Sequence, residues 1–68
     1  MVTVDARGLS CPEPVMLTAD ALKKNGGQQI KVLVSEPHTR ANVEKYAKSQ
    51  GKSVSVTEKD GEFELVIS

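Results

Sequence analysis

The most reactive group in this sequence is the thiol of Cys11, which begins the run Cys11-Pro12-Glu13-Pro14 and is the only cysteine. Proline holds φ near its helical value and lacks the N–H that a first helical turn leaves unpaired, so this run predicts a helix start. A thiol at that position faces free backbone N–H groups and the positive end of the helix dipole. Both stabilise the thiolate, so we predict that Cys11 is a nucleophile near neutral pH.

Other interpretations of Cys11 give its thiol no reactive role. A lone cysteine is often a small buried apolar residue, but the flanking prolines at a helix start favour the reactive one. One cysteine and one histidine, His38, fall short of the three or four protein ligands that zinc takes, so we expect no metal site.

Length and composition restrict the setting. The chain has 68 residues, which predicts a single domain over residues 1–68, and its nine basic residues balance nine acidic ones. This balance argues against a generally basic nucleic-acid binder. A lone cysteine is typical of a reducing compartment. The sequence shows no signal-peptide pattern and no apolar run near the roughly 20 residues that span a bilayer. We therefore expect a soluble cytoplasmic protein without membrane contact.

Apolar periodicity and turn residues divide the chain into six elements. The expected elements are a strand at 2–4, a helix at 12–25, a strand at 30–34, a helix at 39–50, and a hairpin of two strands around Asp60-Gly61. That dipeptide is a strong signal for a two-residue turn. The turn sets Lys59 opposite Glu62, Val56 opposite Leu65 and Val54 opposite Ile67, which places most large apolar side chains on one face.

Each helix is expected to bury one face. The first should bury Val15, Thr18, Ala19 and Leu22, with Met16 at the margin and Leu17 and Ala21 exposed. It should be capped by Gly26-Gly27, with Glu13 in its first turn and Lys23-Lys24 in its last. The second should bury Val43, Tyr46 and Ala47 and end at Gly51.

The element order β-α-β-α-β-β predicts an α/β fold, an α+β two-layer sandwich with a four-stranded mixed sheet. The right-handed crossover rule makes the first two strands parallel and places both helices on one face. Loops that follow parallel strands meet at one sheet edge. The loop with Arg7 and Cys11 should therefore neighbour the loop with Ser35, Glu36, His38 and Arg40. Arg7, Arg40 and His38 are accordingly candidates for contacting an anionic sulfur or a partner, and Gly8 for a turn with positive φ.

Residues 5–16, DARGLSCPEPVM, closely resemble the signature of the TusA/SirA/YedF-like sulfur-carrier proteins. The resemblance covers the whole chain, including Gly27, Gly51 and the Asp60-Gly61 turn. It implies strand order 1-2-4-3 and a Cys11 that accepts sulfane sulfur as a persulfide, with Gly8, Pro12, Glu13 and Pro14 in support. No cofactor is implied beyond the transient persulfide. Such a protein is a sulfurtransferase-like carrier rather than a stand-alone turnover enzyme.

The resemblance also implies partners. These are a sulfur donor, such as a cysteine desulfurase or rhodanese-like protein, and an acceptor sulfurtransferase, for which a DsrE-like protein is a candidate. Family members serve transfer-RNA thiolation, molybdenum-cofactor assembly, sulfur oxidation and, in the YedF branch, selenium metabolism. Glu36-Pro37 and Asn42-Val43 depart from the TusA pattern, and residues 41–51 are closer to the YedF branch. We expect a monomer or a weak dimer through Leu33 and Val66.

Two alternatives belong to other functional classes. One is an RNA-binding module of the same fold. Zero net charge, and the assignment of Tyr46 and Phe63 to the core, disfavour stacking on bases and hence direct nucleic-acid binding. The other is a non-catalytic regulatory or protein-interaction domain in which Cys11 is inert and the first helix docks on a partner. The reactivity of the Cys11 thiol separates these alternatives from the carrier.

Overall fold

The computed structural model describes residues 2–9, 13–25 and 28–68. In chain order the elements are β1 (Val2–Asp5), α1 (Glu13–Lys24), β2 (Ile30–Val34), α2 (Pro37–Ser49), β3 (Val54–Lys59) and β4 (Glu62–Ile67). The β-α-β-α-β-β order is thus confirmed. The predictions for Cys11, Pro12 and the Gly26-Gly27 cap fall outside the described residues.

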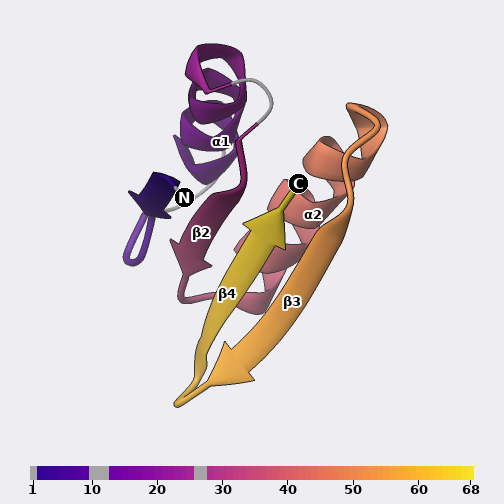
Figure 1. Cartoon of the computed structure of the whole chain (residues 1–68). Helices are drawn as coiled ribbons and strands as arrows, with labels where there is room; N and C mark the ends of the chain where they lie inside the picture. The colour runs from indigo at the N-terminus through magenta and orange to yellow at the C-terminus, as the bar shows by residue number, and fades with distance from the viewer. Residues whose placement is uncertain (1, 10–12, 26–27) are drawn as a thin grey trace.

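The four strands form one sheet in the order β1-β2-β4-β3 (Figure 1). Strands β1 and β2 run parallel, whereas β4 pairs antiparallel with both β2 and β3. The hairpin register is as predicted, with Lys59 opposite Glu62 and Val56 opposite Leu65. Asp60 and Gly61 both have positive φ, at 54° and 78°, which is what a type I′ turn requires. Strand order and topology therefore agree with the expectation.

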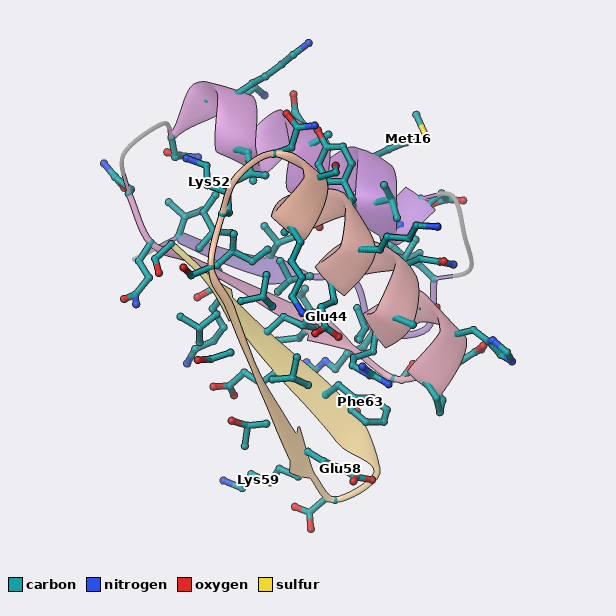
Figure 2. The ribbon with its side chains drawn as sticks, turned by 90° about the vertical axis from the view of Figure 1, so that its right-hand side faces the viewer. Met16, Glu44, Lys52, Glu58, Lys59 and Phe63 are labelled. Atoms are coloured by element: carbon teal, nitrogen blue, oxygen red, sulfur yellow. The ribbon has the colours of Figure 1, made fainter. Side chains whose placement is uncertain are left out.

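The two faces of the sheet differ in their surroundings. Ile30, Val32 and Val34 of β2 and Leu65 and Ile67 of β4 are fully buried. Both helices cover this inner face, as the side view in Figure 2 shows. The outer face carries half-buried side chains from the same strands, namely Lys31, Leu33, Glu64 and Val66. Alternation along β2 and β4 thus produces the predicted two-layer sandwich.

The buried face of α1 is rotated from the predicted one. Pro14, Thr18 and Ala21 are buried, whereas Val15, Ala19 and Leu22 are half-buried. The expectation that Ala21 is exposed is wrong, and that for Leu17 is right, since Leu17 is 39% exposed. Helix α1 packs against α2 as well as β1 and β2, so its buried stripe faces the junction between the sheet and α2. Periodicity could not separate Ala19 from Ala21, because both are small and apolar.

Helix α2 begins two residues earlier than predicted. Glu36 is its extended N-cap, and Pro37 occupies the first turn, a position that needs no backbone N–H. Its buried residues are Thr39, Val43 and Ala47, spaced four apart. Tyr46, predicted to be buried, is only half-buried because it lies beside that stripe.

The end of α2 follows the prediction. Gly51 has φ of +78°, and the Lys52 N–H donates to the Ala47 carbonyl at 3.1 Å. This left-handed cap satisfies carbonyl groups that the helix would otherwise leave unpaired.

Candidate functional site

The loop after β1 leads to Cys11 and is fixed by several hydrogen bonds. Ala6 is fully buried, and its N–H donates to the Leu33 carbonyl at 2.8 Å, which extends the pairing of β1 with β2. The Gly8 N–H donates to Ser35 Oγ at 3.0 Å. The loops after β1 and β2 are therefore neighbours at Gly8 and Ser35, as predicted.

Gly8 serves this loop through its backbone conformation. Its φ is +79°, and a Cβ atom built at Gly8 would have no heavy atom within 4 Å. Space is therefore available for a side chain, but L-residues rarely adopt this φ. The prediction that Gly8 occupies a turn with positive φ is confirmed.

Arg7 lies between two carboxylates. Its Nε donates to Asp5 Oδ1 at 2.9 Å and its Nη2 to Asp5 Oδ2 at 2.8 Å. Its backbone N–H donates to Asp5 Oδ1 at 3.2 Å, and Nη1 reaches Glu62 Oε1 at 3.4 Å. Forked pairing of this kind is stronger and more directional than a single contact between charges. The structure thus gives Arg7 two carboxylate partners, and its role toward an anionic sulfur stays a prediction.

These contacts change the acidity of Asp5. The side-chain hydrogen bond from Arg7 is the largest cause, followed by the backbone hydrogen bond from Arg7, and together they lower the pKa of Asp5 from 3.8 to about 2. Desolvation acts in the opposite direction, and the charge of Arg7 lowers the pKa further. Because the folded pKa lies below the ordinary one, the Asp5 contacts add stability above about pH 4, and this contribution is lost as the pH falls toward 2.

We therefore expect Asp5→Asn to weaken the dependence of stability on pH in this window. Urea unfolding midpoints of both proteins, measured at pH 2, 3, 4 and 7, check this. The difference between wild type and variant should be largest at pH 7 and pH 4 and shrink toward pH 2, because protonated Asp5 resembles asparagine in charge. Other carboxylates titrate in both proteins and cancel in the difference. A difference that stays constant from pH 7 to pH 2 contradicts the assignment.

The first turn of α1 carries two of the predicted supporting residues. Glu13 is exposed at the first helical position, and Pro14 is buried against the core. The Thr18 hydroxyl donates to the Pro14 carbonyl at 2.8 Å, which satisfies a buried polar side chain. Cys11 precedes the first residue of α1 by two positions. The first turn of α1 is therefore the described part of the chain that follows Cys11.

An exposed apolar surface on α1 follows this turn. Met16 is 63% exposed and Leu17 39%, and Met16 projects from the helix away from the sheet (Figure 2). They line a shallow groove together with Glu13, Ala19, Asp20 and Lys23. Sequence reasoning identified Leu17 as exposed but placed Met16 at the margin of the buried face. The adjacent pair Met16-Leu17 was the available signal for an exposed apolar surface. Consecutive residues of a helix point in different directions, so the two side chains do not both face the centre of one buried stripe.

His38 and Arg40 lie in the first turn of α2 rather than in the preceding loop. His38 is exposed. Arg40 Nη1 donates to Glu44 Oε1 at 2.8 Å, and its guanidinium stacks over Phe63 at 5.7 Å from the ring centre. Hydrogen bonding from Lys48, and secondarily from Arg40, holds the pKa of Glu44 below its usual range. Arg40 thus joins α2 to β4, and the anion-contact role of both residues stays a prediction.

Within residues 2–9, 13–25 and 28–68, no three His, Cys, Asp or Glu side chains are grouped so that they could hold a metal ion. The same part of the chain contains no helix with the length and apolarity needed to span a membrane.

Comparison with known proteins places this geometry in a family. The family model described as "Sulfurtransferase TusA" matches residues 2–68. The crystal structure of a SirA-like protein from Desulfitobacterium hafniense superposes with a TM-score of 0.93 at 37% identity, covering 98% of this chain and 95% of that one.

Curated relatives of this chain are named as sulfur carriers. The sulfur carrier protein TusA of Pseudomonas putida is 33% identical over 58 residues, which are 84% of this chain and 72% of the relative. A putative sulfur carrier protein of Aquifex aeolicus is 36% identical over 59 residues, 85% of this chain. The chain spans about a third of the Aquifex aeolicus protein and of a similar one from Bacillus subtilis, 30% and 34% of their lengths. Because the family model matches residues 2–68, this chain belongs to the sulfurtransferase TusA family.

Proposed function

We propose that this protein is a sulfur carrier that accepts sulfane sulfur as a persulfide on Cys11 and relays it to an acceptor protein. The observation that carries the proposal is the position of the only cysteine, two residues before α1, in a chain of the TusA family. The names of the curated relatives from Pseudomonas putida and Aquifex aeolicus support it.

The relay consists of two thiol exchanges. The Cys11 thiolate attacks the terminal sulfur of a donor persulfide, the donor's S–S bond breaks, and its electron pair leaves with the donor thiolate. Cys11 then carries the S–SH group. An acceptor thiolate attacks that terminal sulfur, the new S–S bond breaks, and the Cys11 thiolate is restored. Both steps balance without an external oxidant, reductant or cofactor.

A carrier must present the same sulfur atom to two partners in turn, and the described structure suits this task. The described residues before Cys11 are fixed to Leu33 and Ser35, and α1 begins at Glu13. Next to this turn, Met16 and Leu17 offer an exposed apolar surface on which a partner can bury area. We propose a cysteine desulfurase or rhodanese-like protein as donor. We propose an acceptor sulfurtransferase as the second partner, and a DsrE-like protein is a candidate for it. We also propose a cytoplasmic location.

The proposal requires a reactive thiolate. We expect the N–H groups and dipole of α1 to lower the pKa of the Cys11 thiol, although the exposed carboxylate of Glu13 partly opposes this. The alkylation rate with iodoacetamide, measured from pH 5 to pH 10, should reach half its maximum below the ordinary thiol pKa of about 8.5. N-acetylcysteine provides the matched control. A Cys11 profile that coincides with that of N-acetylcysteine contradicts an activated thiol.

Sulfur transfer itself is tested by incubating the protein with a cysteine desulfurase and L-cysteine, followed by intact-mass spectrometry. A gain of about 32 Da, reversed by dithiothreitol, is the expected product, because a persulfide adds one reducible sulfur atom. A protein that alkylates readily but never gains this mass contradicts the carrier proposal. Supplying candidate acceptors to the loaded protein then separates transfer-RNA thiolation, molybdenum-cofactor assembly, sulfur oxidation and selenium metabolism as its pathway.

A further inference from the structure

The contact between Arg7 and Glu62 joins segments that are 55 residues apart in the chain. Strand β2 separates β1 from β4 in the sheet. The register sets Asp5 beside Leu33, and Leu33 beside Glu64. Arg7 therefore crosses the end of β2 on the outer face, and it lines a small groove there with Leu33, Glu62 and Glu64. The side chain links the loop after β1 to the start of β4.

This link fixes one end of the segment that carries Cys11. The fork from Arg7 to Asp5 holds residues 5–7 together, and the bond from Gly8 to Ser35 Oγ holds the next residue against the loop after β2. On the other side of Cys11, the buried Pro14 fixes the first turn of α1. The described residues on both sides of Cys11 are thus anchored to the fold.

We propose that Arg7 is a positioning residue for Cys11, which acts through Asp5 and Glu62 by tying the loop before the cysteine to the β3–β4 hairpin. This inference rests on the proposed function, because it concerns how partner proteins approach the sulfur. Exposed ion pairs usually contribute little to stability. Here, however, the fork to Asp5 orients the Arg7 side chain so that its third nitrogen reaches Glu62, and the two contacts together restrict the direction of the loop. Direction is what a reaction between two large proteins requires.

The contribution of Arg7 is geometric because its charge is already matched. Asp5 takes two side-chain nitrogens at 2.8 and 2.9 Å, and Glu62 takes the third at 3.4 Å. A lysine keeps the positive charge but has one nitrogen, so it cannot span both carboxylates in this way. The Arg7→Lys variant therefore separates a positioning role from an electrostatic one.

The experiment compares Arg7→Lys, Arg7→Gln and Glu62→Gln with wild type. Lys31→Gln is the matched control, because Lys31 pairs with Glu64 at 3.4 Å on the same sheet face, so its replacement removes one ion pair of similar length. Initial rates of sulfur loading from a cysteine desulfurase are measured by intact mass. We expect both Arg7 variants to load roughly tenfold more slowly, Glu62→Gln to show a smaller decrease, and Lys31→Gln to match wild type. The pH profile of iodoacetamide alkylation should not change, since a small reagent needs no fixed approach.

Amide hydrogen exchange at Gly8 and Leu9 provides a readout that does not depend on sulfur transfer. Exchange should be faster in both Arg7 variants than in Lys31→Gln, while thermal unfolding shows that all variants fold. One outcome would overturn the positioning role of Arg7: Arg7→Lys loads sulfur at the normal rate, while Arg7→Gln loads slowly and has a raised thiol pKa. In that case the positive charge at position 7 acts on the sulfur. Unchanged loading and exchange in every variant also overturn the positioning role. A wild-type protein that takes no sulfur overturns the proposed function instead.

Discussion

Replacing Cys11 with serine is expected to abolish sulfur uptake completely. The chain has no second cysteine, so no other thiol can attack the donor persulfide. Serine is close in size, but its hydroxyl stays protonated near neutral pH and forms no bond equivalent to S–S. After incubation with a cysteine desulfurase and L-cysteine, the wild type should gain about 32 Da per sulfur atom, and Cys11→Ser should gain nothing.

Lys24→Gln provides the control for this experiment. Lys24 pairs with Asp20 at 3.1 Å in the last turn of α1, so its replacement alters one charge on the same helix without touching the loop before Cys11. It should load like the wild type. Circular dichroism of Cys11→Ser should match the wild type, which shows that the loss is chemical. If Cys11→Ser gains the same mass, sulfur resides elsewhere and the relay is wrong. If the wild type gains no mass, a non-catalytic interaction domain becomes the better interpretation.

The strands were predictable because their periodicity has one interpretation. In β2 every second residue is fully buried, and a shift by one residue would turn Lys31 toward the core. The Asp60-Gly61 turn then fixed the register of β3 with β4. The helix faces were less predictable, because α1 has small residues on two sides. Burial of Thr18 agrees with the prediction, whereas burial of Pro14 and Ala21 does not follow from the pattern of one helix, because α1 packs against α2 as well as against the sheet.

The candidate site was predicted in part. Neighbouring loops after β1 and β2 follow from parallel strands alone, and the bond between Gly8 and Ser35 confirms them. The partners of Arg7 could not be assigned from spacing, because Glu62 is distant in sequence. Combining strand order 1-2-4-3 with the hairpin register would have brought Glu62 near the end of β2. Arg40 was linked to the loop by its position in the chain, whereas its side chain pairs with Glu44 and stacks on Phe63.

Replacing Leu65 with alanine is expected to destabilise the fold by about 2–5 kcal/mol. Leu65 is fully buried in β4, where it faces Val32 on one side and Val56 on the other. The substitution removes most of a buried apolar side chain from the core between the sheet and the helices, and it leaves a cavity there. Small domains have a free energy of unfolding of about 5–15 kcal/mol. The Tm should therefore fall by roughly 10 °C or more, since 1 kcal/mol corresponds to about 4–8 °C in a domain of this size.

Val56→Ala is the matched control, because Val56 lies directly opposite Leu65 but belongs to edge strand β3 and is 38% exposed. Its side chain is partly solvated in the folded state, so its truncation should cost less than about 1 kcal/mol. Urea unfolding of both variants measures the two free energies. Equal losses would mean that the helices protect β3 as well as β4, contrary to the observed burial. Unequal losses in the expected order mean that the central strand β4 contributes more to stability than the edge strand β3, and β4 is also the strand whose Glu62 contacts Arg7.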